Sequence, residues 1–392
     1  MRKMPILLAF VGGVAGFAAC GGDNAPVTQA ESAALKVVDG KHNFVKIAAV
    51  VKETDLVRDD AGDVLSNAWG LAFPTGGRFA WMSSNGTGEL QLYDANGVKS
   101  ALTVAVPKGD PTADNASPTG LVFNPSAGAG LFKGDVFIGV TEDGVVFGWQ
   151  PADQTMAVPQ VPPAKPPAEP AVYKGVAIVI LKNKGFLFTA DFHNNKVAVF
   201  DDKYKPVHLF PGAFVDRHLP PMFAPFNIVF HDGLLFVSYA LQDADAHDDA
   251  PGLGNGFIDV FTLDGRLVQR LVSDGVLNSP WGMAFMPGDY DDKFVSRFHD
   301  RKEKVEHLLV GNFGDGFIHV YDLELEHGQF EVAFDGALGD AHNHELFIDG
   351  LWSLSFGTGQ NGFDDKALFF TAGPGGETGG VFGRLNFVTP VR

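Results

Sequence analysis

A short apolar segment, interrupted by glycine or another small residue, recurs along the chain and constrains the fold more than any other feature. Each copy is followed by a second apolar segment and, after a glycine-containing turn, by a third. The first segments are NAWGLAF at 67–73, SPTGLVF at 117–123, YKGVAI at 173–178, APFNIVF at 224–230, SPWGMAF at 279–285 and GLWSLSF at 350–356. The sequence therefore contains six copies of one unit of about fifty residues.

These segments have the character of β-strands. In the first copy Trp69, Leu71 and Phe73 alternate with Gly70 and Ala72, which is the period of two expected of a strand. Both faces are apolar, which suits a sheet packed between two neighbours. A repeat of this length with several short strands and Gly/Asp turns is typical of a propeller blade. The sequence predicts an all-β fold, a six-bladed β-propeller, with a fourth strand in every blade.

The two ends of the repeat array predict how the ring closes. The last copy ends near Leu385, too close to Arg392 for a full fourth strand. The strand-like segment FVKIAAVVK at 44–52 stands before the first copy without a blade of its own. We expect this N-terminal strand to pair into the last blade, because such pairing removes an open sheet edge. The propeller is expected over residues 44–392.

The N-terminus carries an export signal. Arg2 and Lys3 precede an apolar run that ends in small residues before Cys20, so residues 1–19 are predicted to be a signal peptide. The tetrad F-A-A-C resembles a bacterial lipobox, which implies a lipidated Cys20 and a tether over residues 20–43. The expected location is the cell envelope, as an outer-membrane lipoprotein or a periplasmic or extracellular protein, with membrane contact through Cys20 only. Ordinary secretion without lipidation is the alternative.

Two further segments interrupt the repeat. Residues 151–172 contain seven prolines, which favour extended polyproline structure and exclude a sheet interior. They are interpreted as a solvated spacer inside the second blade. Residues 288–306 are densely charged and are interpreted as a solvated loop in the fifth blade.

The repeats and their spacing resemble an uncharacterised bacterial family of secreted six-bladed propellers. The resemblance runs from about Val50 to Phe387 and rests on motifs such as NGTGELQLYD, TEDGVVFGW, ADFHNNKVAVFD and VGNFGDGFIHVYD. It implies the fold and an exported location, but no activity. More distantly, the chain is similar to calcium-dependent lactonase and gluconolactonase propellers and to NHL-type binding propellers, of which only the architecture transfers.

One face of such a propeller brings distant polar residues together. The loop that enters the first strand of a blade and the loop between its second and third strands open on the same face, which we call the mouth. The candidate ligand-binding residues at these two places are Asn67, Asn85, Glu142, Asp191, His193, Asn227, Asn278, Asn312 and Asp349. Amide and carboxylate oxygens are the ligands that Ca²⁺ prefers, and the lactonase propellers use such residues from several blades. Each residue alone is equally a turn former, because Asn and Asp cap their own loops.

The acidic segment 241–256 joins the second and third strands of the fourth blade and therefore falls on the mouth side. The roughly alternating spacing of Asp243, Asp245 and Asp249 is reminiscent of a calcium loop. The glycine and the glutamate that an EF-hand requires are missing. The segment is a candidate metal site, and a solvated acidic loop is the alternative.

The charge balance limits the partners. Lys and Arg total 29 against 47 Asp and Glu, a formal net charge of -18, which argues against nucleic acid. Walker, nucleophile-elbow and dinucleotide motifs are absent from the sequence. The sequence favours a monomer that binds a small molecule, a glycan or a protein at an acidic mouth, with Ca²⁺ as the one cofactor to consider. The alternatives are a calcium-dependent lactonase or esterase with His193 as general base, and a structural cell-envelope protein.

Overall fold

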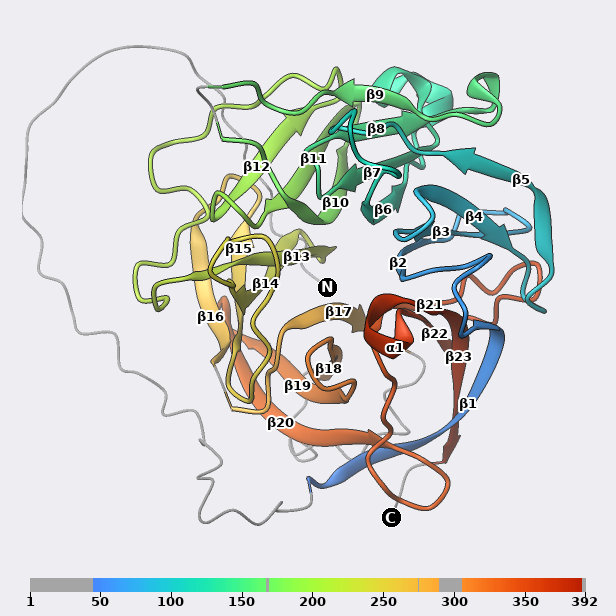
Figure 1. Ribbon diagram of the computed structural model, residues 1–392. Coiled ribbons are helices and arrows are strands. Elements are labelled where there is room, and N and C mark those ends of the chain that lie inside the picture. The colour runs from blue at the N-terminus through green and yellow to red at the C-terminus, as the bar shows by residue number, and fades with distance from the viewer. Residues whose placement is uncertain (1–44, 167–168, 274, 289–304, 390–392) are drawn as a thin grey trace, which may run out of the picture. The chain divides into compact units, whose positions relative to one another are not determined.

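The innermost strands of six blades form a closed ring around a common axis in the computed structural model (Figure 1). The structure describes residues 45–166, 169–273, 275–288 and 305–389. Within these ranges each innermost strand contacts the next along the chain, and the sixth contacts the first. The innermost strands are β2 (Ala68–Ala72), β6 (Pro118–Phe123), β10 (Tyr173–Leu181), β13 (Phe223–His231), β17 (Pro280–Phe285) and β21 (Leu351–Phe356). The predicted six-bladed β-propeller is confirmed.

The remaining strands extend each blade outward as antiparallel neighbours in chain order. The first blade adds β3 (Ala80–Ser84), β4 (Glu89–Tyr93) and β5 (Lys99–Ala105), and the second adds β7 (Phe137–Thr141), β8 (Val146–Trp149) and β9 (Val158–Val161). The third adds β11 (Lys184–Asp191) and β12 (Lys196–Asp201), and the fourth adds β14 (Leu234–Leu241), β15 (Gly256–Thr262) and β16 (Leu267–Ser273). The fifth adds β18 (Val305–Asn312), β19 (Ile318–Glu326) and β20 (Gln329–Gly339), and the sixth adds β22 (Ala367–Ala372) and β23 (Gly380–Thr389).

The N-terminal strand β1 (Ile47–Asp59) supplies the fourth strand of the last blade (Figure 1). From Val50 to Asp59 it pairs antiparallel with β23. Its first residues, from Ile47 to Val50, pair in parallel with β20 of the fifth blade. The predicted closure is therefore confirmed, and β1 also joins the last two blades into one eight-stranded sheet.

The outermost strands differ from the sequence prediction in two blades. The third sheet has three strands in the part of the chain that is described, and an isolated bridge between Phe200 and Pro206 stands where a fourth was expected. In the second blade, β9 falls inside the proline-rich segment 151–172, which was interpreted as a spacer. An outermost strand tolerates proline, because one of its edges needs no ladder hydrogen bonds.

Apolar side chains fill the spaces between neighbouring blades. Among the described residues, six buried clusters each combine two adjacent blades, and a seventh lies at the hub. Between the first two blades, for example, Trp81 stacks on Phe137 with ring centroids 4.0 Å apart. Both faces of each blade are therefore buried, which is why the strands carry apolar residues on both sides.

The blades approach each other most closely at the axis. A Cβ atom on Gly175 would lie 2.6 Å from the Cα of Asn227 in the next blade, so only glycine fits there. Side chains also bond across blades at this depth. Thr119 Oγ1 donates to the carbonyl of Tyr173 at 2.7 Å, Asn227 Nδ2 to that of Trp281 at 2.7 Å and Ser353 Oγ to that of Trp69 at 2.8 Å.

One backbone hydrogen bond recurs at the mouth of every blade. The residue after the second strand donates its amide to the carbonyl of the residue before the first strand. The described pairs are Asn85 to Asn67 (3.1 Å), Glu142 to Ser117 (3.0 Å), Phe192 to Val172 (2.8 Å), Gln242 to Met222 (2.8 Å), Phe313 to Ser279 (3.0 Å) and Gly373 to Gly350 (2.9 Å). The loop that enters the first strand and the loop between the second and third strands thus open on one face of the propeller, as the repeat predicts.

Helical structure is confined to single turns in the described ranges: η1 (Ala127–Ala129), η2 (Leu131–Gly134), η3 (Pro151–Asp153) and α1 (Pro374–Glu377). None of these helices has the length and apolar character that a membrane crossing requires. The predicted signal peptide at 1–19, Cys20, the tether at 20–43 and most of the charged segment 288–306 lie outside the described residues.

Candidate binding site at the hub

Lys174 is the centre of a polar cluster at the mouth. It is the second residue of β10, and 1% of its surface is exposed. Its Nζ atom donates to Glu142 Oε1 at 2.5 Å and to Asp248 Oδ1 at 2.9 Å. Burial by itself would lower the pKa of Lys174, but the charges of Glu142 and Asp248 outweigh it and hold that pKa above its ordinary value. The hub therefore holds an ammonium group between two carboxylates.

Two asparagines extend the cluster from Glu142 toward α1. Asn85 Nδ2 donates to Glu142 Oε2 at 3.0 Å, and Asn67 Nδ2 donates to Glu377 Oε2 at 2.6 Å. The oxygen of Asn67 accepts from Trp352 Nε1 at 2.7 Å, which fixes the orientation of this amide. Desolvation raises the pKa of Glu377, and the nearby charge of Glu142 raises it further.

The loop between β14 and β15 borders the other side of the cluster. His247 Nδ1 lies 3.1 Å from Asp248 Oδ1, and the two side chains are 48% and 61% exposed. The hydrogen bond from His247 lowers the pKa of Asp248, and the same bond raises the pKa of His247. His193 Nδ1 donates to the carbonyl of Ala246 at 3.2 Å. The loop is thus tied to the hub by an ion pair and by a histidine.

Aromatic rings fill the hub beside this cluster. Trp69 and Trp352 stack with ring centroids 3.6 Å apart, and Phe313 stacks on Trp352 at 3.8 Å. Trp281 meets both tryptophans edge-on at 6.3 and 5.9 Å. The Nζ atom of Lys174 lies 5.2 Å from the centre of the Trp69 ring, a distance at which the ring attracts a cation.

Lys174 is not among the residues predicted from the sequence, although the repeat contains a signal for it. The residues at the corresponding position of the six copies are Trp69, Thr119, Lys174, Phe226, Trp281 and Trp352. Four of these side chains are aromatic and belong to the buried hub cluster. A lysine in such a column is a buried charge that needs a partner.

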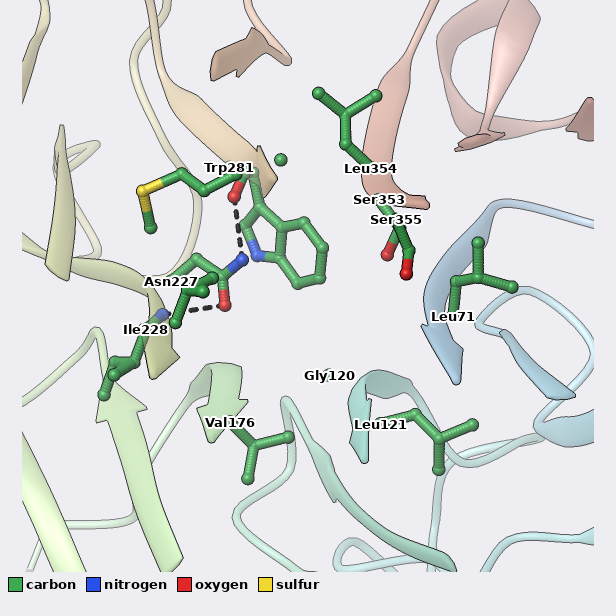
Figure 2. A pocket seen from close by; sticks show the side chains of 13 residues that line it. Leu71, Gly120, Leu121, Val176, Asn227, Ile228, Trp281, Ser353, Leu354 and Ser355 are labelled. Carbon is green, nitrogen blue, oxygen red and sulfur yellow. Dashed lines mark hydrogen bonds between the residues drawn. The ribbon is translucent and has the colours of Figure 1, made fainter. Parts of the chain in front are cut away.

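A cavity of about 120 Å³ lies further along the same innermost strands (Figure 2). All six of these strands contribute to its wall. The apolar side chains that represent them are Leu71, Leu121, Val176, Ile228, Met283 and Leu354. The aromatic residues Trp69 and Trp352 come two or one positions earlier on their strands, so the cavity lies on the side of the aromatic cluster away from the mouth.

Asn67, Asn85 and Glu142 are the predicted residues that the structure joins in one hydrogen-bonded cluster. His193 contacts the neighbouring acidic loop. Asp191 instead bonds within its own turn, where its Oδ1 and Oδ2 each accept from Asn194 Nδ2 at 3.0 Å, and burial raises its pKa.

The other predicted residues have separate partners. Asn278 Nδ2 and Asn312 Nδ2 approach Asp315 Oδ2 at 3.1 and 3.4 Å, and the oxygen of Asn278 accepts from the amide of Gly252. Asp349 Oδ2 accepts from the amide of Gly375 at the start of α1 at 2.8 Å. Asn227 lies in the cavity wall, where its amide bonds the carbonyl of Trp281. Their role in ligand binding stays a prediction.

The acidic loop shows a different grouping from the one expected. Asp243 Oδ1 accepts from the amide of His247 at 2.9 Å, Asp245 is exposed, and burial raises the pKa of Asp249. The ligand atoms that converge at the mouth within 4.8 Å of one another belong to Glu142, His247 and Asp248.

Lys174 determines what this convergent group can hold. Its ammonium already sits between Glu142 and Asp248, and the second oxygen of Glu142 accepts from Asn85. A Ca²⁺ ion needs six to eight oxygen ligands at 2.3 to 2.6 Å and would place two positive charges beside this ammonium. The residues at the centre of the mouth therefore do not fit a calcium ion unless Lys174 leaves.

Comparison with known proteins gives relatives that match most of the chain. Protein R648 of Acanthamoeba polyphaga mimivirus, described as uncharacterised, is 31% identical over 319 residues, which cover 79% of this chain and 72% of the viral one. Protein L690 of the same virus, also uncharacterised, is 27% identical over 360 residues, covering 87% and 85%. The motifs had suggested a bacterial family, whereas these relatives are viral. No family model matches the chain.

Solved structures with a similar fold are more remote in sequence. A gluconolactonase of Xanthomonas campestris is 14% identical with a TM-score of 0.39, and the match covers 88% of this chain and 95% of the other. A streptogramin B lyase is 12% identical with a TM-score of 0.47, covering 87% and 98%.

Proposed function

The chain belongs to the family of the uncharacterised mimivirus protein R648, and we propose that it is a binding module whose acidic mouth holds a cationic organic group without turning it over. The observation that supports this proposal is the excess of carboxylates over cations around Lys174. Glu142, Asp248 and Glu377 face one ammonium group. A second cation would balance the remaining negative charge.

The chemistry of the cluster favours an organic cation over a metal ion. Glu377 and Asp248 keep oxygen atoms free of Lys174, and the Asp248 side chain is 61% exposed. An ammonium or guanidinium group can share carboxylates with Lys174, because it donates directional hydrogen bonds and carries a single charge. The acidic character of the whole chain, with a net charge of -18, raises the local concentration of such ligands.

The absence of turnover is part of the proposal. A carboxylate paired with a buried lysine is a poor general base, because the pair stabilises its charged form. Lys174 itself is held protonated by its two partners, so it is no nucleophile. The calcium-dependent hydrolase remains the competing function, in which an ion displaces Lys174 and His193 acts as general base.

We also propose that the protein is exported and anchored through a lipidated Cys20. The support is the signal-like sequence of residues 1–19 and the F-A-A-C tetrad that ends at Cys20. Metabolic labelling with a fatty-acid analogue tests this, and Cys20→Ser should lose the label while the protein is still exported. If the protein had only a structural role in the cell envelope, the alternative to a binding function, no ligand would bind at the mouth.

Isothermal titration of the full chain with two matched probes tests the binding function. N-acetylarginine amide carries a guanidinium group, and N-acetylcitrulline amide has nearly the same shape without the charge. We expect the arginine probe to bind about tenfold more tightly, which corresponds to one charge-assisted contact. Glu377→Gln should remove most of this preference. Asp232→Asn, in the β13–β14 turn on the opposite face, is the matched control and should retain it.

Equal binding of the two probes, or a preference that survives Glu377→Gln, would contradict the proposal. A melting temperature raised by Ca²⁺, together with lactone or ester hydrolysis that a chelator abolishes, would support the hydrolase instead. Both results come from the same preparation, so the two functions are separated directly.

A further inference from the structure

An apolar patch lies on the mouth face, on loops of the fourth, fifth and sixth blades, beside the polar cluster around Lys174. We call its residues, Pro251, Leu253, Phe317 and Phe347, the apolar rim. Leu253 is 64% exposed and Phe347 is 58% exposed. Pro251 is also exposed, and Phe317 is half-buried. Single apolar residues are normal on a protein surface, whereas a contiguous patch bordered by polar residues is typical of an interaction site.

The loop between β18 and β19 joins these side chains into one surface. A Cβ atom on Gly314 would lie 3.0 Å from the Cβ of Pro251 in the fourth blade. A Cβ atom on Gly316 would lie 3.0 Å from the ring of Phe347, in the loop that enters the sixth blade. The rings of Phe317 and Phe347 meet edge-on with centroids 6.1 Å apart. The apolar rim is therefore continuous across three blades.

The backbone on both sides of Leu253 is fixed by the loop that enters the fifth blade. The amide of Gly252 donates to Asn278 Oδ1. The amide of Gly254 donates to the carbonyl of Leu277 at 2.9 Å. Leu253 thus projects into solvent from a segment that is already held in place. A partner that packs on it pays little for ordering this loop.

Trp352 connects the apolar rim to the Lys174 cluster. Its Nε1 atom donates to Asn67 Oδ1 at 2.7 Å, and Asn67 in turn donates to Glu377. The other neighbour of Trp352 is Phe313, whose ring stacks on it at 3.8 Å. Phe313 is the first residue after β18, in the same loop as Phe317. The carboxylates of the cluster and the apolar rim therefore border one another on the mouth face.

The charge of this face limits what can cover the rim. Asp248 is 61% exposed in the loop that carries Leu253, and Asp349 is exposed two positions after Phe347. These carboxylates and the net charge of -18 repel anionic lipid head groups, and they equally repel a second copy of this chain. A partner that carries both positive charge and apolar side chains is complementary to both parts of the face.

We propose that the mouth face binds a protein segment in which an arginine or a lysine is accompanied by large apolar residues. The basic side chain enters the Lys174 cluster, and the apolar residues pack on Leu253 and Phe347. This inference rests on the proposed function and adds the class of partner to it. A free amino acid or a polyamine would leave the apolar rim exposed to water, whereas a protein segment covers it.

Isothermal titration of the full chain with paired peptides tests this partner class. Each blocked peptide carries one arginine and, one to four residues away on either side, the dipeptide Leu-Phe or the dipeptide Ser-Ser. The two members of a pair have the same charge, so the ratio of their affinities reports the apolar contact alone. At the best spacing we expect the Leu-Phe peptide to bind about tenfold more tightly, because apolar side chains of both partners leave water.

Variants locate this contact. The double variant Leu253→Ser/Phe347→Ser should reduce the tenfold ratio to less than about twofold, because it removes the exposed apolar side chains. Val98→Ser is the matched control and should keep the full ratio. Val98 is also 58% exposed, but it lies in the β4–β5 turn, at the end of its blade away from the mouth. N-acetylarginine amide carries no apolar side chain and should bind all three proteins alike.

The outcomes separate this inference from the proposed function. If N-acetylarginine amide binds but the paired peptides have equal affinity at every spacing, the inference is wrong and the cation-binding function stands. If N-acetylarginine amide does not bind, both are wrong. A peptide ratio that survives in the double variant would also overturn the inference. Sedimentation with phosphatidylcholine vesicles that the double variant abolishes, without any peptide preference, would overturn it in favour of a lipid surface.

Discussion

Lys174 and Glu142 form an ion pair of 2.5 Å that links the third blade to the second at the hub. The lysine is the second residue of the innermost strand of its blade, and the glutamate follows the second strand of the preceding blade. Their side chains are 2% and 12% exposed. Because both side chains are buried, removal of one partner would leave an unpaired buried charge, which costs far more free energy than the intact pair.

Lys174→Met is therefore expected to destabilise the propeller by about 3 to 5 kcal/mol, the usual effect of removing one partner of a buried pair. Urea denaturation followed by tryptophan fluorescence measures it. The double variant Lys174→Met/Glu142→Gln should recover part of the loss, since it leaves no unpaired charge at Glu142. Lys203→Met is the control, because the side chain of Lys203 is 57% exposed in its ion pair with Asp202, and it should cost less than about 1 kcal/mol. A loss of similar size in both single variants would contradict the account.

Removal of β1 is expected to leave the last blade with an open edge. A chain that starts at residue 60 lacks β1, and with it the antiparallel partner on the outer edge of β23 and the parallel partner of β20. It should be insoluble or associate through that edge. A chain that starts at residue 44 keeps β1 and should give a monomer with the melting temperature of the full chain. Light scattering and thermal unfolding of the two chains decide this, and two equally stable monomers would disprove the role of β1.

The repeat made most of the ring predictable, because an apolar segment like that at 67–73 occurs in six copies and its pattern is local. The closing strand was also predictable, from a missing strand at one end and a surplus one at the other. The outermost strands were less predictable. Val158 and its neighbours in β9 are half solvent-exposed and proline-rich, so their pattern does not differ from that of a loop.

The candidate site was predictable only in part, and the reason is geometric. Asn67, Asn85 and Glu142 lie at repeat positions, so topology alone brings them to one face. The ion pair of Lys174 with Asp248 depends on the course of the loop between β14 and β15, which is longer than the loop at the same place in the other blades. Tertiary contacts of such a loop are not encoded in the periodicity.

Asp259 is expected to make the stability of the fourth blade depend on pH. It is fully buried on β15, and Arg270 Nε approaches its Oδ1 only to 3.7 Å. Burial raises the pKa of Asp259 to about 8. A carboxyl whose pKa is higher in the folded state binds more protons there, so stability falls as the pH rises from about 4 to about 8.

The variant Asp259→Asn should therefore be more stable than the parent protein near pH 8, and it should show a flatter dependence of the urea midpoint on pH. Asp114→Asn, at an exposed position, is the matched control and should keep the dependence of the parent. If the unaltered protein instead becomes more stable between about pH 5 and about pH 8, and Asp259→Asn loses this gain, then folding lowers the pKa of Asp259 and the prediction is wrong.

Cation binding at the mouth is expected to strengthen as the pH rises. The pKa of His247 is raised by its hydrogen bond to Asp248, and the pKa of Glu377 is raised by desolvation and by the charge of Glu142. Because both pKa values are raised, each group gives up its proton at a higher pH than it ordinarily would, and each loss makes the site more negative while the guanidinium of N-acetylarginine amide stays charged. The affinity for this probe should rise about threefold to tenfold as the pH is raised at constant ionic strength. His247→Gln and Glu377→Gln should each remove part of the rise. An affinity that is flat or falls with pH would show that the guanidinium does not bind beside these two side chains.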